Sequence, residues 1–347
     1  MTASPAPSED WTAPTVEQVA PGVHRIPLPL PNDGLKAVNV YALEEPGGLV
    51  LVDSGWAVPE GRARLEEGLG RLGAGLGDIR RFLVTHLHRD HYSLGAVLRR
   101  ELGTRLSLGA GEAPSLEVLR TPSRLPLQHQ VRQLQAAGAW DLAGRLAALR
   151  GEAPADPLPW DPPDDWLHEG DLPLDSGRTL AVVETPGHTR GHVVFRSAAE
   201  GLLFAGDHVL PTITPSIGFE PAPSEDPLGE FLASLAKVRR LPDSRLLPAH
   251  GPVAESVHAR VDELTAHHGR RLDQTEAAVR AGAETVAQVA AALRWTRRER
   301  HLDELDVFNQ MLAVGETWAH LRLLEAQGRV RSALDDQGTR RYQLATP

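Results

Sequence analysis

Short apolar runs separated by turn residues dominate the first part of the chain. Between residues 16 and 52 they read GVHRIPLPL and AVNVYALEEPGGLVLVD, with PNDG between them. Such runs are typical of strands joined by hairpins, and EPGG is a hairpin turn. The stretch VPEGRARLEEGLGRLGAGLGDI then has helical spacing, and RRFLVTH has the pattern of a buried strand. The pattern predicts a β-meander that leads into a strand, helix, strand unit.

Helical spacing returns between residues 108 and 150 and gives way to a proline-rich loop, GEAPADPLPWDPPDDW. Strands follow in RTLAVVETPGH, GHVVFRSAAEGLLFAGD and SRLLPAHG, and histidines and aspartates recur where these strands end. Loops at strand ends are where α/β domains carry their chemistry. We therefore expect an α/β catalytic domain over residues 16–254, with a helical insertion at about 108–165.

The pattern changes over residues 255–347, which hold helical segments such as ETVAQVAAALRW and then a hairpin around DDQG. Three helices followed by a hairpin indicate a winged-helix-like domain. A length of 347 residues fits one large and one small domain. Residues 1–15 lack the basic start and apolar core of a signal peptide, and we expect them to form a disordered lead.

Composition narrows the class of protein. The chain is 41% hydrophobic and 24% charged, as in globular proteins, and no apolar run approaches the roughly 20 residues that cross a bilayer. Cysteine is absent, which excludes disulfides, a cysteine nucleophile and thiolate metal ligands. We expect a cytoplasmic protein with no membrane partner, in which any metal is held by imidazole and carboxylate.

Charge argues against nucleic acid as the main partner. The formal net charge is −10, and residues 255–347 hold 13 arginines against 14 acidic residues. The arginines of RWTRRERH are followed at once by Asp303, Glu304 and Asp306, which favours a solvated or ion-paired face over a DNA-binding one. We expect the small domain to pack on the catalytic domain or to mediate assembly, so a homo-oligomer stays open.

The segment LVTHLHRDHYS places His86, His88, Asp90 and His91 within six positions. In a strand, residues i and i+2 share a face, so His86 and His88 are expected to aim at one point. Asp90 and His91, just past the strand end, can aim at a second point. Imidazole suits zinc, iron and manganese, and a carboxylate can bridge two divalent cations. The crowding predicts two metal ions.

Later strand ends supply more candidate ligands: His188 in TPGHTRGH, Asp207 in FAGDH and His250 in LPAHG. This order of motifs over residues 16–252 resembles the metallo-β-lactamase superfamily, whose first motif is H-x-H-x-D-H. The resemblance implies an αββα sandwich with a dinuclear site. It assigns one metal to His86, His88 and His188 and the second to Asp90, His91 and His250, with Asp207 bridging them. Asp53 in LVDSG matches an early aspartate that braces the ligand loop.

The resemblance also sets the expected reaction. A hydroxide that bridges two cations is a nucleophile near neutral pH, and Asp90 is expected to orient it or to pass on its proton. We expect hydrolysis of an ester, thioester or lactone of a small acyl substrate. Zinc is the expected metal, although a site without thiolate also accepts iron or manganese.

Two other functions stay open. The C-terminal region resembles the winged-helix appendage of the β-lactamase-like protein 2 group, which is linked to cleavage of single-stranded RNA, so a metal-dependent endoribonuclease or phosphodiesterase is an alternative. Glyoxalase II shares the ligand set, but the basic C-terminal grip that its glutathione substrate needs has no counterpart here. A non-catalytic binding module is disfavoured because every ligand position is filled.

Other residues in or near the motifs have weaker signals. His192 and His208 are expected to pack or to support ligands rather than to bind metal. Tyr92 and Arg190 flank ligands, and both a substrate contact and a structural role stay open for each. The helical insertion can form a lid, a pocket wall or a dimer face, and its aliphatic character favours covering an apolar surface.

Overall fold

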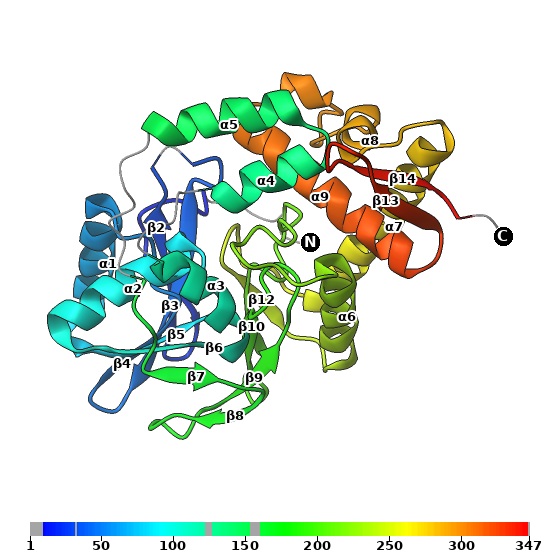
Figure 1. The fold of residues 1–347 in the computed structure, drawn as a ribbon. Helices are drawn as coiled ribbons and strands as arrows, with labels where there is room; N and C mark the ends of the chain where they lie inside the picture. The colour runs from blue at the N-terminus through cyan, green and yellow to red at the C-terminus, as the bar shows by residue number, and fades with distance from the viewer. Residues whose placement is uncertain (1–9, 32, 122–126, 153–159, 346–347) are drawn as a thin grey trace.

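The computed structural model describes residues 10–31, 33–121, 127–152 and 160–345 (Figure 1). Two sheets face each other. The first has seven strands in chain order: β1 (Glu17–Ala20), β2 (Val23–Pro29), β3 (Ala37–Glu45), β4 (Gly48–Val52), β5 (Ile79–Val84), β6 (Arg105–Gly109) and β7 (Asp165–Leu167). The second runs in the order β12 (Arg245–Pro248), β11 (Leu202–Gly206), β10 (Val193–Ser197), β9 (Thr179–Glu184) and β8 (Gly170–Pro173). As predicted, β3 and β4 pair antiparallel across the EPGG turn.

Helices cover the outer side of each sheet. The apolar faces of α1 (Pro59–Arg71), α2 (Arg89–Leu102) and α3 (Ala113–Arg120) share a core with the first sheet. Those of α6 (Pro227–Arg240) and α7 (Val257–Arg280) share a core with the second. None of the helices in the described ranges is both long and apolar enough to cross a membrane.

Alternation along the strands separates the layers. On β5, Phe82 and Val84 face the outer helices, whereas Leu83 faces the space between the sheets. On β10, Val194 faces outward and Phe195 faces inward. Because successive side chains of a strand point to opposite faces, each strand contributes to two cores at once. The result is the αββα sandwich that the sequence predicted.

The C-terminal region contains α7, α8 (Val286–Ala292) and α9 (Val307–Ala326), and then a hairpin of β13 (Val330–Leu334) and β14 (Arg340–Leu344). This is the predicted order of three helices and a hairpin, and the winged-helix interpretation stays a prediction, as do the domain boundaries at 16–254 and 255–347. Of the expected disordered lead, residues 1–9 lie outside the described ranges. Farther along it, the carbonyl oxygens of Trp11 and Pro14 accept hydrogen bonds from Arg25 and Arg71 at 2.8 and 2.7 Å.

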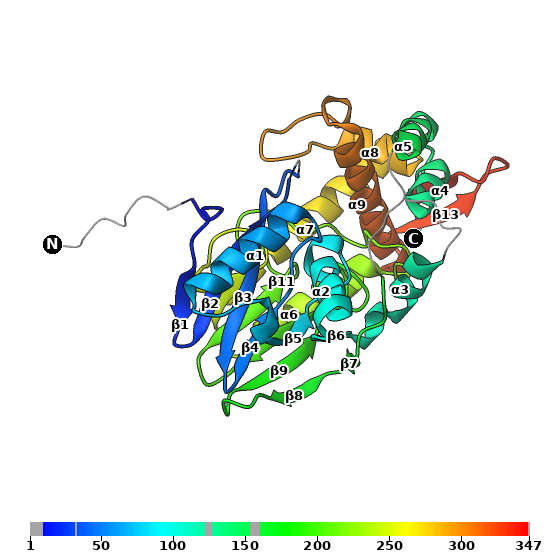
Figure 2. The same ribbon diagram turned by 90° about the vertical axis from the view of Figure 1, so that its left-hand side faces the viewer.

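The insertion helices α4 (Gln128–Ala136) and α5 (Trp140–Glu152) pack on the C-terminal helices (Figures 1 and 2). Leu134, Leu142 and Leu146 belong to the same apolar core as α8, α9 and the outer face of the second sheet. The backbone amide of Ala287 also donates to the carbonyl of Ala137 at 3.0 Å. The apolar surface that the insertion covers is therefore that of the small domain, and one continuous core joins the two domains.

This shared core predicts that an insertion residue stabilises the whole protein. Leu146 is 2% exposed, whereas Leu149 on the same helix is 51% exposed. We expect Leu146→Ala to lower the free energy of unfolding by about 2–5 kcal/mol, because it leaves a cavity in the core. Leu149→Ala should change it little. Chemical denaturation of both variants, followed by circular dichroism, measures the difference, and equal effects would contradict a shared core.

Candidate metal centre

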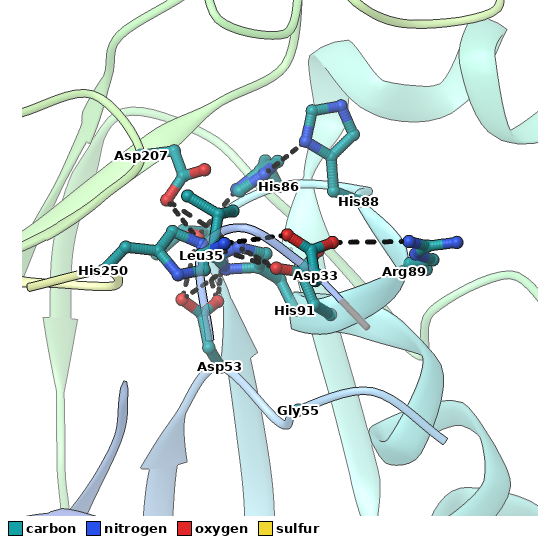
Figure 3. A network of polar contacts seen from close by, with 12 residues as sticks. Asp33, Leu35, Asp53, Gly55, His86, His88, Arg89, His91, Asp207 and His250 are labelled. Carbon is teal, nitrogen blue, oxygen red and sulfur yellow. Dashed lines mark hydrogen bonds and ion pairs between the residues drawn. The ribbon is translucent and has the colours of Figure 1, made fainter. Parts of the chain in front are cut away.

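The seven predicted ligands meet where strands of both sheets end. His86 follows β5, His188 follows β9, Asp207 follows β11 and His250 follows β12. Figure 3 shows Asp207 and His250 facing the histidines of the first motif across a common space. Strand ends gather on one edge of a sheet, so the two facing sheets deliver ligands to the same place.

The predicted reason for the convergence of His86 and His88 was wrong. His86 and His88 do not lie in a strand, because β5 ends at Val84. The chain bends after Thr85, and His88 is the residue directly before α2. The bend, and not strand alternation, brings the two rings together, with His86 Nε2 3.0 Å from His88 Nδ1. The structure brings the predicted residues together, but their convergence has another origin.

His86, His88 and His188 form the first group. The Nε2 atom of His188 lies 3.2 Å from Nε2 of His86 and 3.1 Å from Nδ1 of His88, which closes a triangle of ring nitrogens. Ligands of a tetrahedral zinc ion with Zn–N bonds of about 2.0–2.1 Å are separated by about 3.3–3.4 Å. The triangle is therefore close to the size that a single metal ion requires.

Hydrogen bonds on the far side of each ring fix where its lone pair points. Nε2 of His88 contacts the carbonyl oxygen of Phe219 at 2.7 Å, and Nδ1 of His188 contacts that of Ser216 at 2.7 Å. A carbonyl oxygen only accepts, so these nitrogens carry the protons. In neutral rings the nitrogens that face each other then both present lone pairs, which repel unless a cation lies between them. Burial lowers the pKa of His188 to about 3, so this ring is neutral.

The second group consists of His91, His250 and Asp90. Nδ1 of His250 donates to the carbonyl of Ala37 at 2.7 Å, so its Nε2 lone pair points inward, 3.4 Å from Oδ2 of Asp90. Nε2 of His91 lies 3.5 Å from the same oxygen. Lone pairs that face a carboxylate oxygen again require a cation between them, either a proton or a metal ion.

Asp207 lies between the two groups and turns one oxygen toward each. Its Oδ2 is 3.5 Å from Nε2 of His188 in the first group. Its Oδ1 is 3.4 Å from Nε2 of His250 and 3.8 Å from Nε2 of His91 in the second. Asp207 thus offers one carboxylate oxygen to each group.

Unpaired ring nitrogens and a carboxylate oxygen, together with the histidine and aspartate side chains themselves, make the site suitable for divalent metal ions. Nε2 of His91, Nε2 of His250 and Oδ1 of Asp207 are buried and have no hydrogen-bond partner within the described ranges. Buried polar atoms are rarely left unpaired, and a place for an ion is one reason for it. Although burial opposes the charged ring, the carboxylates of Asp90, Asp53 and Asp207 raise the pKa of His91 to about 10. A metal ion that displaces this proton would neutralise the same carboxylates.

Asp53 braces the second group from behind. Its Oδ2 accepts from Nδ1 of His91 at 2.9 Å, and its Oδ1 accepts from the backbone amide of Thr85 at 2.8 Å. One carboxylate thus orients a ligand ring and fixes the bend that precedes His86. The backbone of Asp53 has φ 61°, a left-handed conformation that costs about 1–2 kcal/mol in a residue other than glycine. These contacts agree with the bracing role expected of Asp53, which stays a prediction.

The C-terminal domain holds the loop that supplies the carbonyls of Ser216 and Phe219. Arg260 of α7 donates to the carbonyl oxygens of Leu210 and Ile213 at 2.6 and 2.8 Å. The ring of Phe308, at the start of α9, meets that of Phe219 edge-on with centroids 5.6 Å apart. The small domain therefore helps to position His88 and His188 through this loop, whose carbonyl groups contact their rings.

The structure shows the contacts of each of the four residues that had weaker sequence signals. Nε2 of His192 accepts from the backbone amide of Asp207 at 3.1 Å, so His192 supports the bridging residue. His208 turns into the core against Phe231, with ring centroids 5.2 Å apart. Tyr92 is buried and donates to the carbonyl of Asp161. Arg190 donates through its side chain to the carbonyl of Ala222 at 3.2 Å, which makes it part of the loop scaffold.

Two buried carboxyl groups were missed by the sequence reasoning. Glu112 accepts from the hydroxyl of Thr189, beside His188, and Glu220 accepts from the backbone amide of Arg190 at 2.7 Å. Burial raises the pKa of both carboxyl groups. Glu112 follows the end of β6, which is the same strand-end signal that identified the histidines, and Glu220 lies in the loop after Asp207.

Glycine at position 191 allows this scaffold to close. A Cβ atom there would lie 2.0 Å from the backbone nitrogen of Glu112. Any larger residue would force the HTRGH segment away from the end of β6, and the carboxyl of Glu112 would lose Thr189. Gly191 is therefore needed for the close contact between the HTRGH segment and the residues that follow β6.

A family model described as metallo-beta-lactamase superfamily matches residues 33–250, more than half of the chain. The chain belongs to the metallo-β-lactamase superfamily. A second model, described as the metallo-beta-lactamase-like C-terminal domain, matches residues 272–345. Membership and the His/Asp metal-binding cluster make the protein a metal-dependent hydrolase.

Solved structures agree over nearly the whole chain. A metallo-beta-lactamase family protein from Thermus thermophilus is 30% identical with a TM-score of 0.76, covering 94% of this chain and all of that one. A beta-lactamase domain protein from Burkholderia ambifaria is 27% identical with a TM-score of 0.74, covering 99% and 98%.

Among curated relatives, the probable metallo-hydrolase YqjP of Bacillus subtilis (strain 168) is 25% identical over 89% of this chain and 93% of its own length. The beta-lactamase-like protein 2 homolog of Drosophila melanogaster is 29% identical over 69% of this chain and 67% of its own length. The homolog in Caenorhabditis elegans is 37% identical, but the match covers only 30% of that protein.

The bracing role of Asp53 predicts a loss of metal affinity on its replacement. Asp53→Asn keeps the shape but presents an amide where both His91 and Thr85 need acceptors. We expect metal affinity to fall about 10- to 100-fold. Asp33→Asn, which alters a carboxylate paired with Arg89 at 3.5 Å, is the matched control and should leave affinity unchanged. Competition with a chromophoric chelator measures both, and equal affinities for Asp53→Asn and the unsubstituted protein would contradict the role.

Proposed function

We propose that the protein is a dinuclear hydrolase that cleaves an ester, thioester or lactone of a small acyl substrate in the cytoplasm. The position of Asp207 carries the dinuclear part, because its two oxygens face different groups of lone pairs at 3.4–3.8 Å. Zinc is the metal that we propose, since the donors are imidazole and carboxylate in a compact arrangement. Bound divalent ions lower the pKa of a coordinated water and polarise a carbonyl oxygen.

Asp90 is the residue that we assign to proton handling. Its side chain is 15% exposed, whereas those of Asp53 and Asp207 are 3% and 7% exposed. Although burial opposes it, the facing rings of His91 and His250 hold the pKa of Asp90 well below its usual range. An ionised, partly exposed carboxylate at this point can accept a hydrogen bond from the attacking water and orient it.

The rim of the centre supports an acyl substrate. Phe219 lies beside His88, with ring centroids 5.9 Å apart. Phe308 is 44% exposed and packs against Phe219, and the two rings form an apolar ledge beside the centre. Such a ledge favours a small molecule with an apolar acyl group. RNA cleavage is the alternative that we weigh against it, and the net charge of −10 disfavours a polyanion.

The bridging geometry predicts the effect of removing one carboxylate. Asp207→Ala should lower the metal content by at least one equivalent per chain and reduce turnover to background. The backbone amide that donates to His192 is kept in this variant. Asp171→Ala, on the edge strand β8, is the control and should change neither quantity. Metal analysis beside activity measures both, and full metal content with full activity in Asp207→Ala would contradict the assignment.

The substrate class is tested with a panel on the metal-quantified protein: an acyl thioester, an acyl lactone, bis-p-nitrophenyl phosphate and a single-stranded RNA. We expect chelator-sensitive hydrolysis of the acyl substrates alone, because the rim is apolar and the protein is acidic. Phe308→Ala should raise KM for the longer acyl chains more than it changes kcat. Chelator-sensitive cleavage of RNA, without acyl hydrolysis, would replace the proposal with the nuclease alternative.

A further inference from the structure

A second cluster of potential metal ligands lies outside the catalytic centre, between α7 and α9. His267 and His268 of α7 and Glu316 of α9 each offer a ligand atom, and these atoms all lie within 4.8 Å of one another. His268 is fully buried, and His267 and Glu316 are half-buried. Two helices thus present imidazole and carboxylate to one point in the small domain.

Hydrogen bonds fix the lone pair of His268. Nδ1 of His320 lies 2.8 Å from the carbonyl oxygen of Glu316, and because that oxygen only accepts, Nδ1 carries the proton. Nε2 of His320 is then an acceptor, and it lies 3.2 Å from Nδ1 of His268. Nδ1 of His268 therefore donates, which leaves its Nε2 as a lone pair. Burial lowers the pKa of His268 to about 2 and that of His320 to about 4, so both rings are neutral.

That lone pair has no partner. Nε2 of His268 is buried and unpaired in the part of the chain that the structure describes. No hydrogen bond or ion pair joins the side chains of His267 and Glu316 to another described residue either. A buried, unpaired ring nitrogen that is oriented from behind, beside two further potential ligands, is a feature that the catalytic centre also has.

The neighbouring cation does not fill this place. The guanidinium of Arg271 lies over the ring of Trp295 at 4.4 Å and donates to the carbonyl oxygen of Arg294 at 3.1 Å and to Gln274 at 3.3 Å. These contacts hold the guanidinium, and no hydrogen bond joins it to Glu316 in the described ranges, although its positive charge opposes the rise that burial causes in the pKa of Glu316. The carboxylate of Glu316 thus feels the charge of Arg271, but its oxygens are not used in a hydrogen bond to that guanidinium and can bind a second cation.

We propose that His267, His268 and Glu316 bind one divalent transition-metal ion of the Zn²⁺ type, which cross-links α7 and α9. His268 is fixed, whereas the half-buried His267 and Glu316 can rotate to bring the ligand atoms to about 3.3 Å, the separation that tetrahedral zinc requires. Water takes the fourth position, since both side chains reach the surface. The ion has a structural role and stabilises the helices that carry Arg260 and Phe308.

The test is metal stoichiometry, which does not depend on activity. The full-length protein and the double variant His267→Ala/Glu316→Gln are saturated with Zn²⁺, freed of excess by gel filtration and analysed by mass spectrometry for zinc per chain. We expect the double variant to hold one equivalent less and to keep its hydrolytic activity. We also expect Zn²⁺ to raise the melting temperature less in the variant than in the unsubstituted protein.

Two controls make the result specific. His168→Ala removes an exposed imidazole of the catalytic domain and should keep the full zinc content. Glu316→Gln alone preserves the packing, so if the double variant fails to fold, this single variant should still lose affinity for the same equivalent roughly tenfold or more. Equal zinc content in the double variant and the unsubstituted protein, or an equal loss in His168→Ala, would overturn the site.

Discussion

The structure depends on a convergence of lone pairs and carboxylates that only cations can stabilise. Ring nitrogens of His86, His88 and His188 lie 3.0–3.2 Å apart, and hydrogen bonds on the far side of the rings turn them inward. Unpaired polar groups in a buried site cost free energy, so the rest of the fold must hold them together. The two sheets pack through a common apolar core, and this packing holds in place the strand ends that carry these residues. The apolar layers and the polar centre are therefore two parts of one arrangement.

The small domain takes part in this arrangement although it contributes no predicted ligand. Carbonyls of Ser216 and Phe219 orient His188 and His88, and the loop that carries them is tied to α7 by Arg260. The insertion helices α4 and α5 pack on the other side of the small domain and anchor it by a continuous apolar core. Displacing the small domain would release the loop first and the two histidines with it. Metal affinity and domain packing are thus coupled through backbone carbonyl groups.

Histidines and aspartates at strand ends gave the seven candidate side chains, which converge in the structure, and the family resemblance of their motifs predicted the sandwich. Sequence reasoning failed where the signal is not local. The bend after Thr85 replaced a predicted strand, since a buried apolar run does not show where the strand ends. The partner of the insertion was undetermined, because an amphipathic helix has the same pattern whatever it covers. Glu112 was missed although it follows a strand end, because a lone carboxylate has no spacing to distinguish it.

The metal centre favours a negatively charged group, whereas the surface of the protein repels one. Three carboxylates, those of Asp53, Asp90 and Asp207, surround the second group of ligands. Two divalent ions and a bridging hydroxide, as proposed, would add four positive charges and one negative charge, which the three carboxylates would balance to a net charge of about zero. A metal ion in such a centre would stabilise the negative charge that develops on a carbonyl oxygen in the proposed acyl hydrolysis. The surrounding protein carries −10, which repels long polyanions before they reach the rim. The proposed small substrate with an apolar acyl group would meet both conditions, because it would approach without repulsion and acquire negative charge only at the metal ions.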